Sequence, residues 1–421
     1  MKKIFYLTLL FAFCLNFSNT FAQNIRCKLE GKVIGRSSKS LRLLKVTENF
    51  QFEGIKIPIV KNAFSYELKA PFVEKYELIF EDEIEDGGFK QIEFFAENGT
   101  LNFVLHSIDD FDKNTITGST LTRKMVDFER QKMLKISTQN KPIRVILDSL
   151  ERVDNYYSEK AKQLQAQMRN KPTENERYTL LASLKELRES GEMWTPLALA
   201  QMNRRDSMIR QRLKWEYEYI GQNPDIFSYS LLLALTVRYE EDKKDIDIMA
   251  VTELFPTFSK LYPNHPYTPK IAEMLNAIHN LKVGDHFLDF SAPTIDGEMK
   301  KVSELIKGKV AVIDMWASWC GPCRYLSKSM IPVYEKYKDK GFTIVGVAAE
   351  FKTKEPFKAA IKKDKYPWTN LIELDKQNGI WNKYNISASA GNTYLVDSKG
   401  IILAIHPKAE ELDKILGDIL K

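Results

Sequence analysis

Two cysteines separated by two residues stand where a buried strand gives way to a helix. The run Trp319-Cys320-Gly321-Pro322-Cys323 follows an apolar segment, Val310 to Ile313, which is β-branched apart from one alanine. Such a segment is typical of a parallel strand that is covered on both faces. Pro322 suits the first turn of a helix, where its missing N–H costs nothing. The pattern therefore predicts an α/β domain with a dithiol at the start of a helix.

A dithiol in this position is predicted to be reactive. Thiols react as thiolates, and a helix N-terminus lowers the pKa of a cysteine from its ordinary value of about 8.5 through unpaired amide groups and the helix dipole. We expect Cys320 to be exposed at the helix start and to be the attacking thiol. Cys323, one turn further, is expected to be more buried and to act as the resolving thiol. Gly321 lets the backbone turn tightly and lets a partner chain approach.

An acidic residue lies within the apolar strand. Asp314 precedes Cys320 by six residues, and a carboxylate at such a position is costly unless it has a partner or a function. Burial is expected to raise its pKa. It could then accept the proton of Cys323 when a mixed disulfide is resolved. The alternative is an ordinary aspartate at an exposed strand end.

The sequence offers little support for other uses of the two cysteines. A zinc site needs two further Cys or His ligands at a compatible spacing, but the chain has no second C-x-x-C and no paired histidine. The five histidines are scattered: His106, His265, His279, His286 and His406. A purely structural disulfide across so small a loop is also disfavoured. We therefore expect redox catalysis by the cysteine pair, with no metal and no organic cofactor.

Several motifs on both sides of the cysteines follow a familiar order. They are Gly284-Asp285 with Phe287, Phe290-Ser291-Ala292-Pro293, Asp296-Gly297, Lys307-Gly308-Lys309, the Trp-Cys-Gly-Pro-Cys run, Gly341 to Val347, and Tyr394 to Ile402. With them, residues 283–421 resemble a thioredoxin-fold domain, in particular the secreted thioredoxin-like disulfide reductases of the TlpA/ResA type. The resemblance implies a redox-active Cys320–Cys323 disulfide and disulfide reductase activity. Asp314 falls where cytosolic thioredoxins have a buried aspartate, which favours a reductant.

Two positions depart from the pattern of that family. Gly391 replaces the cis-proline that thioredoxins place beside the dithiol, in a loop from Ser387 to Thr393 that is one residue longer. Because non-proline cis bonds are rare, we expect a different, trans path, on which Gly391 still lets a substrate backbone come close. Lys328 replaces the proline that many relatives have five residues after the second cysteine. Pro332 is expected to kink or break the helix instead.

Peroxiredoxins share the thioredoxin fold and the Ala-Pro motif. Their peroxidatic cysteine follows the pattern Pro-x-x-x-Thr/Ser-x-x, whereas Ile313 and Ala317 stand seven and three residues before Cys320. The sequence therefore argues against direct chemistry on peroxides.

Residues 1–22 have the three parts of a signal peptide. Lys2 and Lys3 are followed by an apolar stretch from Ile4 to Phe17 and by Thr20-Phe21-Ala22, an acceptable cleavage site. The apolar core of about 14 residues is short of the ~20 that a membrane span needs, so cleavage after Ala22 is preferred to a membrane anchor. This predicts export to the periplasm of a Gram-negative type of cell envelope, without stable membrane insertion of the mature chain.

The number of cysteines and the net charge indicate how the mature chain can be stabilised and which partners it can bind. After cleavage the chain keeps Cys27, Cys320 and Cys323, too few to stabilise a secreted protein of this size by disulfides. Cys27 is expected to be a lone thiol, with an intermolecular disulfide as the alternative. The formal net charge of +6 is mild and spread along the chain, which gives no indication of nucleic-acid binding.

Two further parts are predicted ahead of the thioredoxin-like domain, which we place at 282–421. Residues 23–117 are β-rich, because apolar residues alternate with a period of two at 25–33, 61–68 and 76–80. This pattern is typical of a small antiparallel sheet or sandwich. It loosely resembles the β domain of unassigned function that often precedes secreted thioredoxin-like domains.

Residues 118–281 are predicted to be helical, because their apolar residues recur at spacings of three and four. The most apolar helix, 224–235, is expected in the core of an interface. Five prolines fall where helices are expected to start: Pro142, Pro172, Pro196, Pro224 and Pro266.

The leading hypothesis is an exported thiol–disulfide reductase that acts on disulfide-containing client proteins. Cys320 attacks the client disulfide, and Cys323 resolves the mixed disulfide with Asp314 as its base. The docking surface is expected to comprise Trp319, Gly321, Pro322 and Gly391. The family implies a membrane thiol transporter as electron donor. Two other hypotheses stay open: a disulfide oxidase or isomerase, and a non-enzymatic, redox-sensitive binding module.

Overall fold

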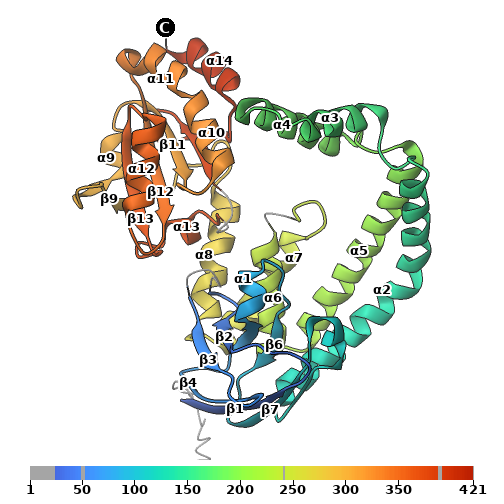
Figure 1. Cartoon of the computed structure of the whole chain (residues 1–421). Coiled ribbons are helices and arrows are strands. Elements are labelled where there is room, and N and C mark those ends of the chain that lie inside the picture. The colour runs from blue at the N-terminus through green and yellow to red at the C-terminus, as the bar shows by residue number, and fades with distance from the viewer. Residues whose placement is uncertain (1–23, 49–52, 240–241, 387–390, 421) are drawn as a thin grey trace, which may run out of the picture.

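The computed structural model describes residues 24–48, 53–239, 242–386 and 391–420. The predicted signal peptide at 1–22 lies outside the described residues. Figure 1 shows an N-terminal β domain in blue, long helices in green and yellow, and a C-terminal α/β domain in orange and red. The chain is therefore multidomain, with its β, helical and α/β parts in the predicted order.

Two sheets pack face to face in the N-terminal β domain. Its elements are β1 (Ile25–Val33), β2 (Ser40–Lys45), β3 (Ile55–Pro58), β4 (Ala63–Ala70), β5 (Lys75–Phe80), α1 (Glu81–Glu85), β6 (Ile92–Phe95), β7 (Gly99–Leu105), η1 (Ile108–Lys113) and β8 (Thr115–Thr117). One sheet has the order β4-β1-β7-β8 and the other β3-β2-β5-β6. The strands expected from the period of two are confirmed as β1, β4 and β5.

One pair of strands differs from the antiparallel arrangement that was expected. β1 and β7 run parallel. β1 and β7 are far apart in the sequence, and the chain enters β7 from β6 of the other sheet. No hairpin therefore joins β1 to β7, and a parallel pairing is possible.

Long helices connect the β domain to the C-terminal domain. They are α2 (Thr120–Arg152), α3 (Glu159–Arg169), α4 (Glu174–Ser190), α5 (Pro196–Gln222), α6 (Ile226–Arg238), α7 (Ile248–Leu261) and α8 (Tyr267–Asn280). The apolar helix expected at 224–235 is confirmed as α6, which is buried over most of its length among α2, α5, α7 and α8. No helix within the described ranges has both the length and the apolar composition needed to cross a membrane.

The prolines mark helix starts with one exception. Pro196 is the first residue of α5, Pro266 precedes α8, and two others lie just ahead of the capping residues of α4 and α6. The prediction for Pro142 is wrong, because this residue lies inside α2. A proline inside a helix removes one backbone hydrogen bond. Packing of Ile143 and Leu147 against α5 holds α2 together across this point.

The C-terminal domain has the thioredoxin fold. Its elements are β9 (Ser291–Pro293), β10 (Met299–Lys301), α9 (Val302–Leu305), β11 (Val310–Trp316), α10 (Gly321–Ser329), α11 (Ile331–Tyr337), η2 (Lys338–Lys340), β12 (Phe342–Glu350), α12 (Glu355–Asp364), β13 (Thr369–Leu374), α13 (Ile380–Lys383), β14 (Asn392–Val396), β15 (Ile402–Ile405) and α14 (Ala409–Ile419). The sheet has the order β13-β12-β11-β14-β15, with β12 parallel and β14 antiparallel to the central β11.

The central strand β11 positions the dithiol. All of its side chains are buried, because apolar clusters cover both faces of the sheet. The chain passes from β11 into α10, which ends at Ser329, and α11 begins at Ile331. Pro332 stands in the first turn of α11. The predicted break of the active-site helix is therefore confirmed.

The thioredoxin domain contacts the rest of the chain on two sides (Figure 1). On one side α8 runs into it, and Ala277 and Leu281 belong to the same apolar core as the domain itself. A hydrogen bond of 3.0 Å from Lys270 Nζ to Asn382 Oδ1 supports this contact. On the other side the hairpin of α3 and α4 reaches across to α10. The α/β domain thus shares an apolar core with α8, and its helix α10 contacts α4.

Candidate active site

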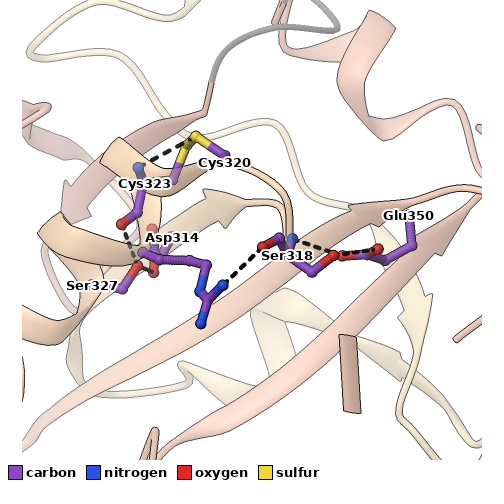
Figure 2. Close-up of a disulfide and its surroundings, with 7 residues drawn as sticks. Asp314, Ser318, Cys320, Cys323, Ser327 and Glu350 are labelled. Atoms are coloured by element: carbon purple, nitrogen blue, oxygen red, sulfur yellow. Dashed lines mark hydrogen bonds between the residues drawn. A yellow bond between two sulfur atoms is a disulfide. The ribbon is translucent and has the colours of Figure 1, made fainter. Parts of the chain in front are cut away.

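Cys320 and Cys323 are joined by a disulfide at the N-terminus of α10. Cys320 is the capping residue, and its Sγ accepts a hydrogen bond of 3.3 Å from the backbone N–H of Cys323. Figure 2 shows the disulfide above Asp314 and Ser327, with Ser318 and Glu350 to one side. The unpaired amides of the helix N-terminus thus face the sulfur of Cys320, where they would stabilise its thiolate.

The exposure of the two cysteines is the reverse of the prediction. Cys320 is only 7% exposed, whereas Cys323 is half-buried. An element remote in sequence covers the start of α10. The hydroxyl of Tyr178 in α4 lies so close to Gly321 that a Cβ at this glycine would collide with it. The expectation of an exposed Cys320 was therefore wrong, and the contact at the next residue, Gly321, comes from a helix that the local pattern of strand and helix does not include.

Asp314 is buried below the dithiol in β11, with 2% of its surface exposed. Burial raises its pKa to about 7, and a hydrogen bond donated by Ser327 partly opposes this shift. Ser327 Oγ lies 2.6 Å from Asp314 Oδ2 and 3.0 Å from the carbonyl oxygen of Cys323. A carboxyl group with such a pKa can take up and release a proton near neutral pH.

Ser327 was missed in the interpretation of the sequence. It lies four residues after Cys323 and is fully buried. Residues four apart share one face of a helix, so a serine at this spacing could have been predicted to face the buried Asp314. Its hydroxyl connects the carboxyl group to the backbone of the second cysteine.

A second polar network holds the segment that precedes the dithiol, and it too was missed. The backbone N–H and the hydroxyl of Ser318 donate to the two carboxylate oxygens of Glu350, each at 2.8 Å. Burial raises the pKa of Glu350, and these two hydrogen bonds oppose the shift. Arg324 Nη1 donates to the carbonyl oxygen of Ser318 at 3.1 Å, while Nε and Nη2 bind both oxygens of Asp364 at 2.6 and 2.9 Å.

Gly391 lies directly against the second cysteine. A Cβ at this position would lie 2.7 Å from Cys323 Sγ and would also collide with the carbonyl oxygen of Met315. Only glycine therefore fits beside the sulfur without displacing it. The described peptide bonds are all trans, but residues 387–390 of the predicted loop lie outside the described residues.

The remaining residues of the predicted docking surface surround the disulfide. Trp319 is 46% exposed, and its ring centroid lies 6.4 Å from that of Phe351. Pro322 is exposed, while Gly321 is partly covered. Groups of three or more His, Cys, Asp or Glu side chains that could hold a metal ion are absent from the described residues.

Comparison with known proteins supplies the family. Residues 283–405 match the AhpC/TSA family. The chain is 34% identical over 128 residues to the thioredoxin-like protein YneN of Bacillus subtilis (strain 168), which covers 30% of this chain and 72% of that protein. It is 31% identical over 140 residues to the thiol-disulfide oxidoreductase ResA of Oceanobacillus iheyensis, covering 32% of this chain and 70% of that protein. This chain belongs to the thioredoxin-like thiol–disulfide oxidoreductases.

A solved structure is also similar to this oxidoreductase. The thioredoxin domain of a thiol-disulfide oxidoreductase from Bacteroides vulgatus is 27% identical, covers 33% of this chain and 99% of that chain, and has a TM-score of 0.31. The family predicted from the Trp-Cys-Gly-Pro-Cys run and its neighbouring motifs is confirmed by the sequence relatives. The disulfide between Cys320 and Cys323 is the oxidised form of the dithiol that such a protein uses.

Proposed function

We propose that this oxidoreductase is an exported reductase of disulfides in cell-envelope proteins. The observation that supports the reducing direction is Asp314, buried below Cys323 with a pKa raised by burial to about 7. A reductase has to ionise its resolving thiol after the client is bound, and a general base works best when its pKa lies near the operating pH. Ser327 holds Asp314 on the Cys323 side of the site.

The reaction starts from the reduced dithiol. The Cys320 thiolate attacks one sulfur of the client disulfide, the client S–S bond breaks, and the first client sulfur leaves as a thiolate that takes up a proton from solvent. Asp314 accepts the proton of Cys323, whose thiolate attacks Cys320 in the mixed disulfide. The second client sulfur then leaves and is protonated. The client gains two electrons, and the enzyme is left with the Cys320–Cys323 disulfide.

The assignment of Cys320 as attacking thiol rests on its position at the helix N-terminus, where the Cys323 N–H points at its sulfur. We assign client docking to the surface around it. Trp319 and Pro322 are exposed there, and Gly391 leaves room beside the Cys323 sulfur. Gly321 would lie under the client backbone once it is uncovered.

Reduced enzyme has to be regenerated from the disulfide. We propose a membrane thiol transporter as the electron donor, since an exported protein has no soluble reducing pool around it. The signal-peptide pattern at 1–22 supports a periplasmic location. Dithiol exchange needs no metal and no organic cofactor, and the mild net charge gives no reason to expect a nucleic-acid partner.

Trapping of mixed disulfides tests the roles of the two thiols. In the full-length protein, Cys323→Ser should accumulate client proteins linked through Cys320, and Cys320→Ser should not. Trapping by Cys320→Ser alone would reverse the assignment. A measurement of the reduction potential then tests the direction, because a value well above that of thioredoxin, about −270 mV, would favour oxidation of clients.

A further inference from the structure

The hairpin formed by α3 and α4 makes an aromatic contact with the active-site helix α10. Tyr178 near the start of α4 packs on Tyr325 of α10, with ring centroids 4.6 Å apart. The Tyr178 hydroxyl lies against Gly321, between the two cysteines. Figure 1 shows the turn between α3 and α4 pointing toward the thioredoxin domain, while the other end of the hairpin continues into α2 and α5.

This contact differs in kind from the contact made by α8. Ala277 and Leu281 of the α8 side are part of the apolar core of the thioredoxin domain. The apolar cluster of the hairpin, by contrast, is internal and is centred on Ala161, Leu187 and Met193. The hairpin therefore rests on the active-site helix without sharing a core with it, so it can separate from α10 while both parts stay folded.

The position of the contact has a direct consequence for the dithiol. The attacking thiol needs an approach path to a client disulfide, but Cys320 is 7% exposed. Tyr178 occupies the space above Gly321, which lies inside the predicted docking surface. Trp319, on the neighbouring side, stays 46% exposed. The hairpin thus covers the docking surface at Gly321, next to Cys320, and leaves Trp319 open.

We propose that the α3–α4 hairpin is a movable cap on the dithiol. In the closed arrangement the Tyr178–Tyr325 pair holds it over Gly321 and keeps Cys320 from the disulfides of folded proteins. The cap opens by separation of the two rings before a client binds. The proposal rests on the proposed function only in taking Cys320 as the thiol that meets the client, and it holds for either direction of electron flow.

The accessibility of Cys320 to reagents of two sizes tests this cap. The full-length protein is used with Cys323→Ser, so that Cys320 is a free thiol, and both N-ethylmaleimide and a polyethylene-glycol maleimide are applied. Mass spectrometry of peptides separates modification of Cys320 from that of the buried Cys27. The measured quantity is the ratio of the rate with the large reagent to the rate with the small one.

Tyr178→Ala should raise this ratio by about 2- to 10-fold, the change expected from losing one aromatic pair. Tyr325→Ala removes the same pair from the other side, leaves the hairpin sequence intact, and should raise the ratio equally. The double variant should match either single variant, because the two rings act as one contact. Leu197→Ala is the control, since its side chain lies in α5, outside the hairpin, and is 50% exposed; its ratio should equal that of the Cys323→Ser parent.

An unchanged ratio in both tyrosine variants would overturn the cap. Additive effects of the two substitutions would also overturn it, because they would mean that the rings do not act through each other. Circular dichroism of each variant checks that the helices stay folded. Trapping of clients by Cys323→Ser is measured separately, so a failed cap and a failed assignment of the thiols give different results.

Discussion

Ser327 donates a hydrogen bond of 2.6 Å to Asp314, and the same hydroxyl lies 3.0 Å from the carbonyl oxygen of Cys323. A hydroxyl group has one proton to donate. When Asp314 is ionised, Ser327 donates to it. When Asp314 is protonated, its own O–H can donate to Ser327, which then donates to Cys323. The protonation of the buried carboxyl is thereby coupled to the first turn of the active-site helix.

Ser327→Ala should shift the pH profile of the resolving step upward. The hydrogen bond from Ser327 favours the ionised form of Asp314, so its loss raises the pKa of Asp314 further. We expect a shift of about one pH unit, since one unit corresponds to ~1.4 kcal/mol. The measurement is the rate at which Cys323 releases a client model from Cys320, followed against pH. Ser329→Ala is the matched control, because its hydroxyl binds only the backbone carbonyl of Leu326 among the contacts described; an unshifted profile for Ser327→Ala would contradict the prediction.

Asp314→Asn should stabilise the protein at high pH and slow resolution of the mixed disulfide. The pKa of Asp314 is raised to about 7 in the folded chain, against about 3.9 when unfolded. The folded chain keeps a proton that the unfolded chain releases, so stability falls as the pH rises from about 4 to 7 and the loss is complete above this range. Removing the titration should return up to about 4 kcal/mol.

Calorimetric unfolding of the wild type and of Asp314→Asn across this pH range measures the effect. The difference between their transition temperatures should grow with pH and level off above about pH 7. A constant difference would show that Asp314 does not titrate in this range. The resolving step of the variant should be roughly 10²-fold slower, as is typical for the loss of a general base.

Gly391→Ala should destabilise the protein and disturb the disulfide. The added Cβ would lie 2.7 Å from Cys323 Sγ, which is too close for two unbonded atoms, and overpacking of this kind costs about 1–3 kcal/mol. Thermal unfolding of the oxidised protein measures the loss. Gly88→Ala is the control, because a Cβ there meets nothing within 4 Å; equal transition temperatures for the two variants would argue against a close approach of Gly391 to the sulfur.

Arg324→Lys should loosen the segment ahead of the dithiol. Lysine keeps the charge but lacks the planar fork that binds both oxygens of Asp364 and the carbonyl of Ser318. Because Asp364 is buried, we expect a loss of about 1–3 kcal/mol in the free energy of unfolding. Arg130→Lys, in an exposed pair with Asp127, should change it by less than about 0.5 kcal/mol. Denaturant unfolding of both variants provides the comparison, and equal losses would refute the role of the fork.

The helical part shows where pattern alone succeeds and where it fails. The most apolar segment is the buried helix α6, as predicted, because a helix that is apolar all round has to be buried. Pro332 broke the active-site helix as its fixed geometry requires. Pro142 did not start a helix, because contacts of Ile143 and Leu147 with α5 outweigh the lost hydrogen bond. A prediction from local sequence thus holds unless packing against a distant element stabilises the chain by more than the local preference costs.

The candidate site divides in the same way. The dithiol and Asp314 could be predicted because each depends on residue type and on the periods of one strand and one helix. The place of Gly391 beside the dithiol was predicted only from the resemblance to thioredoxins, which have a proline there. The second polar network could not be predicted, since Glu350 and Asp364 reach Ser318 and Arg324 from the end of β12 and from α12. Their partners are neighbours only after the sheet has formed.

By itself the sequence determined the chemistry of this protein: a thioredoxin fold, a cysteine pair at a helix N-terminus and a carboxyl group inside the preceding strand. Only the tertiary structure decided which surfaces surround the dithiol. Tyr178 lies against Gly321, the residue after Cys320, because α2 and α5 carry the α3–α4 hairpin to the thioredoxin domain. A contact between such distant segments depends on the summed geometry of every helix between them, which no local period encodes.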